Sequence, residues 1–214
     1  MKKILILAVW TLLSTFVYGQ YDQKARTILD AMSDKYSKIS TYKATIVSSL
    51  VNEIDGINEK MSGEITVKGN KFRLKIDGQE IYNDGSTVWT YLSEVNEVNI
   101  DNHDPEEELI SPSKIYNAYK KGYKYVHLSE STVSGSVCDE VDLVPENAKD
   151  SQFFKIKLFI SQKDRGLVRW TIFEKSGSKT IYDINDFKSG MTVSDAYFRF
   201  NKSEYPGVEV IDLR

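Results

Sequence analysis

The hydrophobic residues of this chain follow two periods, and the change from one to the other lies near Thr41. Between residues 22 and 39 apolar side chains recur every three or four positions, at Ala25, Ile28, Leu29, Met32, Tyr36 and Ile39. That spacing is typical of one face of an amphipathic helix. Beyond Thr41 the period becomes two, which is typical of half-buried strands. The pattern therefore predicts one helix followed by a series of strands.

The alternation is clearest in two segments of the second region. Residues 41–51 place on one face Tyr42, Ala44, Ile46, Ser48 and Leu50. In residues 71–76, the apolar side chains Phe72, Leu74 and Ile76 lie opposite Arg73 and Lys75. Glycine-containing turn signals at 55–56, 68–70, 77–78 and 84–85 separate such segments at the short spacing of an antiparallel meander.

The middle of the chain interrupts the strands. Pro105 precedes three glutamates, which favour the positive end of a helix dipole, and Lys120-Lys121-Gly122 is a typical helix end. We expect one or two short helices here, broken near Pro112. Strands resume after Tyr123 and include residues 195–201, for a total of nine or ten.

The amino terminus has the pattern of a secretory signal peptide. Lys2 and Lys3 precede an apolar run from Ile4 to Val17, and Gly19 suits cleavage before Gln20. The run is shorter than the roughly 20 residues of a membrane span. We therefore expect residues 1–19 to be removed and residues 20–214 to form one exported, soluble domain. An uncleaved helix that anchors the protein to the inner membrane is the alternative.

Charge and cysteine content narrow the possible functions. Residues 20–214 carry 26 basic and 31 acidic side chains, which argues against nucleic acid as a partner. Cys138 is the only cysteine, so no internal disulfide can form, and its flanks predict a buried thiol in a strand. No cysteine lies near the expected cleavage point, which leaves no site for an amino-terminal lipid.

Residues with catalytic or metal-binding chemistry do not form a recognisable motif. His103 and His127 lack the spacing of a zinc site, and no serine lies in a G-x-S-x-G elbow. Glu106, Glu107 and Glu108 are consecutive, so on a helix they point in different directions. The pattern predicts no catalytic residues, no metal site and no cofactor, and hence a binding protein.

Aromatic residues are concentrated in the strands. For any one of them a packed core explains the position. A single sheet of this many strands must curl, however, and only two modest helices are available to cover its inner face. A curled sheet under a thin lid favours an apolar cavity, which would suit an acyl chain.

Five segments resemble, in order, the periplasmic outer-membrane lipoprotein carrier family, LolA: "SGEITVKGNKFRLKI", "YNDGSTVWTY", "DLVPEN", "KDRGLVRWTIFEKSGSKTIYDINDF" and "FRFNKSEYPGVEVID". The sharpest features are the Asp84-Gly85 turn, which is followed by Val88-Trp89 and Tyr91, and the closing Phe-x-Phe with Pro206-Gly207-Val208. No single feature is diagnostic, but together they span nearly the whole chain after residue 19.

The resemblance implies a mainly β fold with helices: a strongly curved, unclosed antiparallel β-barrel with an α-helical lid over a hydrophobic cavity. The lipid-binding wall is then expected from Phe72, Leu74, Ile76, Trp89, Tyr91, Val168, Trp170, Ile172, Phe198 and Phe200. On the strand that carries Trp89 only one face can line the cavity, and we favour the face of Trp89 and Tyr91 over that of Val88 and Thr90. The lid is expected from Ile28, Met32, Leu109, Ile110, Ile115 and Tyr116.

The family's function, carried over, is a monomeric periplasmic carrier that takes acylated lipoproteins from an inner-membrane lipoprotein-releasing transporter toward an outer-membrane acceptor. A periplasmic sensor of lipids or lipoproteins with a related fold is the alternative. One departure concerns the lid, because many relatives have an Arg-Pro pair where this chain has Gly69-Asn70. Arg73 is not at the matching position, so the latch role of that arginine is not assigned to it.

Overall fold

The computed structural model describes residues 22–103, 115–149 and 151–214. Within these residues the strands are β1 (Thr41–Asn52), β2 (Ile57–Lys68), β3 (Lys71–Ile76), β4 (Gln79–Asn83), β5 (Thr87–Leu92), β6 (Glu97–Asn102), β7 (Tyr123–Val133), β8 (Ser136–Pro145), β9 (Phe153–Ser161), β10 (Leu167–Glu174), β11 (Lys179–Ser189) and β12 (Glu209–Asp212). They form one sheet in the order β12-β6-β5-β4-β3-β2-β1-β11-β10-β9-β8-β7. Neighbours are antiparallel except β12, which runs parallel to β6.

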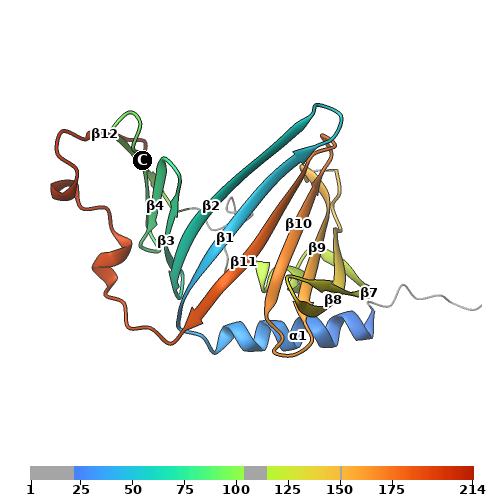
Figure 1. The fold of residues 1–214 in the computed structure, drawn as a ribbon. Helices are drawn as coiled ribbons and strands as arrows, with labels where there is room; N and C mark the ends of the chain where they lie inside the picture. The colour runs from blue at the N-terminus through green and yellow to red at the C-terminus, as the bar shows by residue number, and fades with distance from the viewer. Residues whose placement is uncertain (1–21, 104–114, 150) are drawn as a thin grey trace, which may run out of the picture.

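The sheet is strongly curved and does not close into a barrel. Figure 1 shows β1, β2, β11 and β10 as a long sloping wall, with β3 and β4 on one side of it and β7 to β9 on the other. The fold class predicted from the resemblance is confirmed. The described residues contain more strands than the nine or ten predicted, because the short strands β6 and β12 were not recognised in the sequence.

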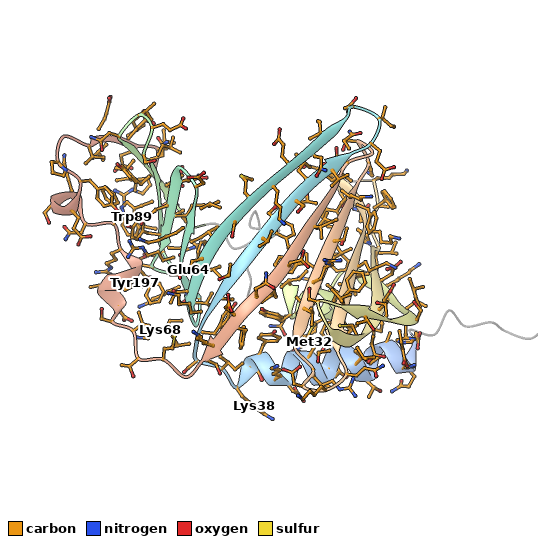
Figure 2. All side chains as sticks on the ribbon, viewed as in Figure 1. Met32, Lys38, Glu64, Lys68, Trp89 and Tyr197 are labelled. Carbon is orange, nitrogen blue, oxygen red and sulfur yellow. The ribbon has the colours of Figure 1, made fainter. Side chains whose placement is uncertain are left out.

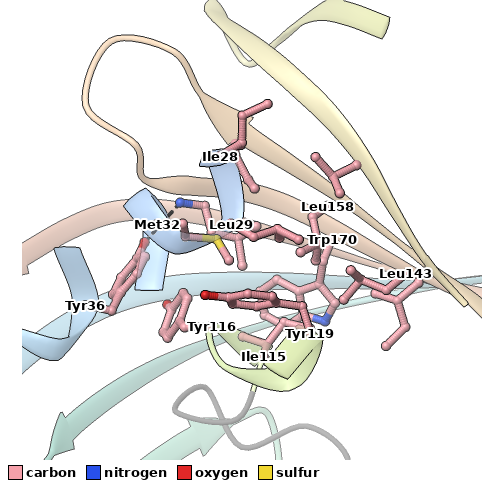
Figure 3. Packing of buried hydrophobic residues seen from close by; sticks show 14 of the residues in the cluster. Ile28, Leu29, Met32, Tyr36, Ile115, Tyr116, Tyr119, Leu143, Leu158 and Trp170 are labelled. Atoms are coloured by element: carbon pink, nitrogen blue, oxygen red, sulfur yellow. Dashed lines mark hydrogen bonds between the residues drawn. The ribbon is translucent and has the colours of Figure 1, made fainter. Parts of the chain in front are cut away.

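Helix α1 (Gln23–Ser37) begins at Asp22, whose carboxylate accepts hydrogen bonds from the N–H groups of Lys24 and Ala25 at 2.8 and 3.2 Å. The same carboxylate accepts from the N–H of His127 on β7 at 2.8 Å, which joins the helix start to the edge of the sheet. The apolar stripe predicted for this helix is buried. It packs against the concave face of β8 to β11, in the cluster shown in Figure 3.

Two contacts hold the other end of α1 to the sheet. Lys35 forms an ion pair with Asp164, in the loop between β9 and β10, at 2.5 Å. The hydroxyl of Tyr36 accepts a hydrogen bond from the N–H of Leu167 at 3.1 Å, and its ring stacks on Tyr116 with centroids 3.4 Å apart. The helix is therefore fixed at both ends over one half of the sheet.

Tight turns join the strands at the predicted glycines. At the β4–β5 turn the carboxylate of Asp84 accepts from the N–H groups of Ser86 and Thr87 at 3.1 Å each. Gly85 has a φ of +95°, and a Cβ there would lie 2.6 Å from Nδ2 of Asn70 in the β2–β3 turn. Only glycine suits this position, because it combines a left-handed backbone with close packing of two turns.

Residues 190–214 form a carboxy-terminal arm that leaves β11 and crosses the convex face of β3 to β5 (Figure 1). The arm contains the 3-10 helices η2 (Asp195–Phe198) and η3 (Lys202–Glu204) and ends in β12. The strand predicted for residues 195–201 is therefore wrong. These residues pack their side chains on an outer face instead of pairing their backbone with the sheet.

The middle of the chain is described only in part. Of the predicted helical segment, the described residues hold the 3-10 helix η1 (Ala118–Lys120), and residues 104–114 lie outside the description. In the described part of the chain no helix is long and apolar enough to cross a membrane. Residues 1–21 are likewise outside the description, so the signal peptide stays a prediction.

Candidate ligand-binding cavity

An apolar cavity of about 450 Å³ lies on the concave side of the sheet. It is lined mainly by the inward faces of β1 to β5, with one residue each from β10 and β11. The lining residues are Ile46, Ser48, Met61, Gly63, Ile65, Phe72, Leu74, Ile76, Ile81, Val88, Thr90, Trp170 and Tyr182. Apolar walls with a few polar groups are typical of small-molecule binding sites.

Hairpin register brings these residues together. Ile65 on β2 pairs with Leu74 on β3, Leu74 pairs with Ile81 on β4, and Ile81 pairs with Thr90 on β5. Side chains of directly paired residues point to the same face of a sheet. One row of paired residues therefore crosses four strands of the cavity wall.

The wall side chains of β3 are less buried than those at the base of the cavity. Phe72, Leu74 and Ile76 are half-buried, whereas Ile65 and Trp170 are each 2% exposed. Trp170 also belongs to the packed cluster under α1, beside Ile115 and Tyr119 (Figure 3). The cavity thus begins where the packed core under the helix ends.

Three polar side chains lie in one row of this inner face. Ser48 on β1 pairs with Tyr182 on β11, and Tyr182 pairs with Trp170 on β10. The rings of Trp170 and Tyr182 stack with centroids 4.6 Å apart. Burial raises the pKa of the Tyr182 hydroxyl, and a hydrogen bond with Ser48 lowers it in part. The Tyr182 side chain is therefore a neutral hydroxyl at physiological pH.

The convex side of the same wall is covered by the carboxy-terminal arm. Four rings form an outer aromatic cluster: Tyr82, Tyr91, Phe200 and Tyr205. Phe200 stacks on Tyr205 with centroids 4.7 Å apart, and the hydroxyls of Tyr82 and Tyr205 lie 2.6 Å apart. Phe198 of the arm is fully buried. The wall is consequently packed on the side away from the cavity.

Arg73 joins the arm to the sheet. Its guanidinium lies between two rings, 4.5 Å from the centroid of Tyr82 and 4.7 Å from that of Tyr197 on the arm. It also donates to Glu80 at 2.8 Å. Burial raises the pKa of Glu80, but hydrogen bonds from Tyr82, Arg73 and Lys75 outweigh that effect and hold it at about 2. Glu80 is therefore a carboxylate with several donors around it.

Ion pairs fasten the arm at two further places. Asp195 lies 2.8 Å from both Lys68 and Lys71, at the β2–β3 turn. Arg199 donates to Asp84, the turn residue between β4 and β5, at 2.9 Å. The aspartate of the Asp-Gly turn thus has two roles, because it shapes the hairpin and also binds the arm.

The sequence-predicted wall residues of β3 and β10 do not all line the cavity. Phe72, Leu74, Ile76 and Trp170 line the cavity, and Ile172 lies in the packed cluster under α1. Val168 does not share their face, because the register shifts between Leu167 and Arg169 where β10 pairs with β9. Leu167 takes the inward position instead and is buried in the cluster.

Four predicted wall residues lie away from the cavity. Val88 and Thr90 line it, so the preference for the face of Trp89 and Tyr91 is wrong. Tyr91 and Phe200 meet in the outer aromatic cluster, and Figure 2 shows Trp89 on the side of the sheet where the arm lies. Phe198 is buried within the arm's contact with the sheet. These aromatic residues pack the outside of the wall.

The predicted lid residues that are described are part of the core. Ile28, Met32, Ile115 and Tyr116 are all buried in the cluster under α1. Leu109 and Ile110 lie outside the described residues. The helix therefore covers the half of the concave face that is next to the cavity, and its side chains fill that half.

The cavity residues that were not predicted as part of the binding wall are Ile46, Ser48, Met61, Gly63, Ile65, Ile81, Val88, Thr90 and Tyr182. For some of them the sequence contained a usable signal, the pairing register set by short hairpin turns. The turn at Asp77-Gly78 pairs Ile76 with Gln79, which makes Ile81 share the face of Leu74. Across the next turn Asn83 pairs with both Phe72 and Val88, so Val88 shares the face of Phe72. Register at short hairpins would thus have predicted the correct face of β5.

Other groups with chemical potential have ordinary partners. His127 Nε2 lies 3.2 Å from Asp139, and Cys138 is buried in β8, where burial raises the pKa of its thiol. Among the described residues no three potential ligands gather into a metal site. A second hollow, of about 520 Å³ between α1, η1 and β7, is lined by side chains of both charges, including Arg26 and Asp30. It does not suit an apolar ligand.

Comparison with known proteins agrees with this architecture. The sequence model of the family described as "Outer membrane lipoprotein carrier protein LolA" matches residues 37–201. No curated protein matches the chain.

Solved structures have the same fold at low sequence identity. An uncharacterized conserved protein from Thermus thermophilus is 15% identical, with a TM-score of 0.59 over 89% of this chain and 99% of that one. The lipoprotein LppX from Mycobacterium tuberculosis is 12% identical, with a TM-score of 0.52 over 81% of this chain and 100% of that one. LprF from Mycobacterium bovis is 15% identical, with a TM-score of 0.50 over 82% of this chain and 98% of that one.

Proposed function

Because the chain belongs to the LolA family of outer membrane lipoprotein carriers, we propose that it carries acylated lipoproteins through the periplasm. In this proposal the apolar cavity shelters acyl chains while the lipoprotein moves from the inner membrane toward the outer membrane. The chain acts by binding and not by catalysis. Family membership supports a lipid- or lipoprotein-binding role in general, and the carrier role is its more specific form.

The observation that carries the proposal is the open apolar wall of β3. Phe72, Leu74 and Ile76 face a cavity although a helix covers the neighbouring half of the same sheet. An acyl chain gains roughly 0.8 kcal/mol for each methylene group that leaves water. A wall of this kind therefore provides ample driving force for binding an acyl chain.

Location and partners follow from the same role. Removal of residues 1–19 would release an exported domain of residues 20–214, which acts as a monomer in the periplasm. Its donor is an inner-membrane transporter that releases lipoproteins, and its acceptor lies at the outer membrane. The ligand passes between them without contact of its acyl chains with water.

Depletion in the source bacterium tests the role. When the chain is depleted together with any paralogue, lipoproteins destined for the outer membrane should accumulate in the inner membrane fraction. Wild-type chain should restore sorting, a Leu74→Glu variant should not, and the outward variant Lys60→Glu on β2 should restore it. Normal sorting after depletion would overturn the carrier role.

A further inference from the structure

One face of β7 to β11 carries a row of side chains in which lysine alternates with apolar residues. In strand order from β7 to β11, the members of this lysine row are Lys124, Val144, Lys155, Phe173 and Lys179. Lys124 pairs with Val144. Phe173 pairs with both Lys155 and Lys179. Paired side chains point to the same face of a sheet, so the row crosses adjacent strands.

The lysine row lies on the convex face, away from α1 and from the cavity. Leu143 on β8 pairs with Ile156 on β9, and both are buried in the cluster under the helix. Side chains of successive residues in a strand point to opposite faces. Val144 and Lys155 therefore stand next to each other on the outer face of the sheet.

A bulge adds an exposed aromatic ring to this face. The register of β9 against β10 shifts between Phe173 and Glu174, and Phe154 is the residue that the pairing skips. Bulges re-aim side chains in this way. The side chain of Phe154 is 47% exposed, and its ring contacts that of Phe173 with centroids 6.1 Å apart. An apolar surface is thus presented to solvent among the lysines.

The charge of this surface differs from that of the whole chain, in which residues 20–214 carry 26 basic and 31 acidic side chains. Two carboxylates, Asp142 and Glu53, lie 3.3 and 3.0 Å from lysines of the row. Lys124 has no ion pair with the described residues, and Lys175, in the turn after β10, donates to backbone carbonyl oxygens. The lysine row and Lys175 therefore place four cations beside two carboxylates.

We propose that the lysine row, together with Phe154, docks the chain reversibly on the surface of an anionic lipid bilayer. The ammonium groups face lipid phosphates, while the lysine stems and the phenylalanine rings lie at the boundary of the headgroups and the acyl chains. Lys155 Nζ lies 4.4 Å from the ring centroid of Phe173, which shows that one place on this face presents both a cation and a ring. This inference goes beyond the proposed function, because it concerns the outside of the sheet.

The spacing of the row favours a bilayer over an acidic protein. Lysines two strands apart are separated by about 10 Å across the sheet, and an apolar side chain stands between them. A bilayer offers anionic groups over its whole surface with hydrocarbon directly beneath them, so it matches every member of the row at once. A protein would need carboxylates and apolar side chains at the same spacing.

Co-sedimentation of the chain with lipid vesicles measures the docking. Vesicles of phosphatidylcholine and phosphatidylglycerol in equal amounts should bind the chain, and vesicles of phosphatidylcholine alone should bind it at least about fivefold more weakly, since each lysine near an anionic surface contributes about that factor. High salt should release the chain from the anionic vesicles, because it screens exposed charges.

Two pairs of matched variants locate the surface. Lys124→Glu should lower the affinity for anionic vesicles by about fivefold or more, whereas Lys163→Glu, on the exposed loop after β9, should bind like the wild type. Phe154→Ala should lower the affinity by about fivefold, whereas Leu128→Ala on β7, where the side chain is 48% exposed, should leave it unchanged. Urea midpoints of all four variants establish that they are folded.

A further variant separates docking from the proposed function. Leu74→Glu alters the cavity wall and should still bind anionic vesicles, while Phe154→Ala should still take up a triacylated lipoprotein from solution. Equal binding to both kinds of vesicle, or loss of vesicle binding in Leu74→Glu but not in Phe154→Ala, would overturn the docking surface and leave the carrier role standing. Absence of binding to either kind of vesicle would also overturn it, in favour of an acidic protein as the partner of this face.

Discussion

Strands β8, β9 and β10 bury their inward side chains beneath α1, whereas β3, β4 and β5 turn theirs toward a cavity. In the first half Leu143, Leu158 and Ile160 are fully buried. In the second half Phe72 and Leu74 are only half-buried. Strands β3 and β9 alternate apolar and polar residues in a similar way, so the difference between them lies in what the rest of the chain places against each face.

The second half has its core on the opposite side. The carboxy-terminal arm packs Phe198 and the outer aromatic cluster against the convex face of β3 to β5. Each half of the sheet is therefore packed on one face, by α1 from inside or by the arm from outside. Because the arm stabilises β3 to β5 from the convex side, their inner face can stay open for a ligand while the strands remain folded.

The largest effect is expected when the outer core is removed. Phe198→Ala should lower the free energy of unfolding by about 3–5 kcal/mol, because it leaves a cavity where the side chain was fully buried. Amide exchange should rise in β3 to β6 and change little in β8 and β9. The exposed Phe154→Ala serves as control and should lower stability by less than about 1 kcal/mol. Uniform loss of protection over the whole sheet would contradict the division into two halves.

The second prediction compares two leucines on the concave face of the sheet, Leu158 on β9 under the helix and Leu74 on β3 at the cavity. Leu158→Ala should lower the free energy of unfolding by about 2–5 kcal/mol, since Leu158 is fully buried. Leu74→Ala should lower it by no more than about 1.5 kcal/mol, because its side chain already borders empty space. Urea denaturation of both variants gives the comparison. Equal losses would show that the wall of β3 is packed as tightly as β9.

The smallest effect is expected at Glu80, whose carboxylate accepts hydrogen bonds from Arg73 and from Tyr82 of the outer aromatic cluster. The pKa of Glu80 is about 2 in the folded chain and 4.5 ordinarily. A lowered folded pKa means that this contribution is complete above pH 4.5 and is lost as the pH falls toward 2. Glu80→Gln should cost about 1–2 kcal/mol at pH 7 and should lose less stability than the wild type between pH 5 and pH 2.

Urea unfolding at several pH values measures this dependence. The exposed residue Glu94 provides a matched control, since Glu94→Gln changes the same functional group on the surface and should follow the wild type. If Glu80→Gln and the wild type lost stability in parallel across this range, the ion pair would not contribute to holding the arm.

Much of the fold could be predicted from local patterns. The three- and four-residue spacing from Ala25 to Tyr36 predicted α1, and the confirmed inward face of β3 followed from alternation in residues 71–76. Such predictions succeed where one face is buried and the other is solvated, because apolar side chains then occupy the first face and polar side chains the second. The number of strands and the scarcity of helices predicted a curled sheet with a cavity, and the family resemblance added that the sheet stays unclosed.

The errors have two physical causes. Alternation fails at a bulge, as between Leu167 and Arg169, because one extra residue exchanges the faces that follow it. It also gives no signal where both faces carry large apolar side chains, as on β5, whose aromatic side meets the arm and whose other side meets the cavity. The arm itself lacks a strand or helix period, since its residues fit a surface that only the folded sheet provides.

The central claim is that the inner wall of β3 binds a ligand instead of forming part of the core, and Leu74→Glu tests it most directly. Uptake of a triacylated lipoprotein and the urea midpoint are measured together for this variant, for Leu158→Glu under the helix, and for Lys60→Glu on the outer face of β2. Leu74→Glu should lose at least about tenfold in uptake with a modest shift in midpoint, because water reaches the new carboxylate through the cavity. Leu158→Glu should unfold, and Lys60→Glu should behave like the wild type. Collapse of Leu74→Glu to the same extent as Leu158→Glu, or uptake equal to the wild type, would contradict the claim.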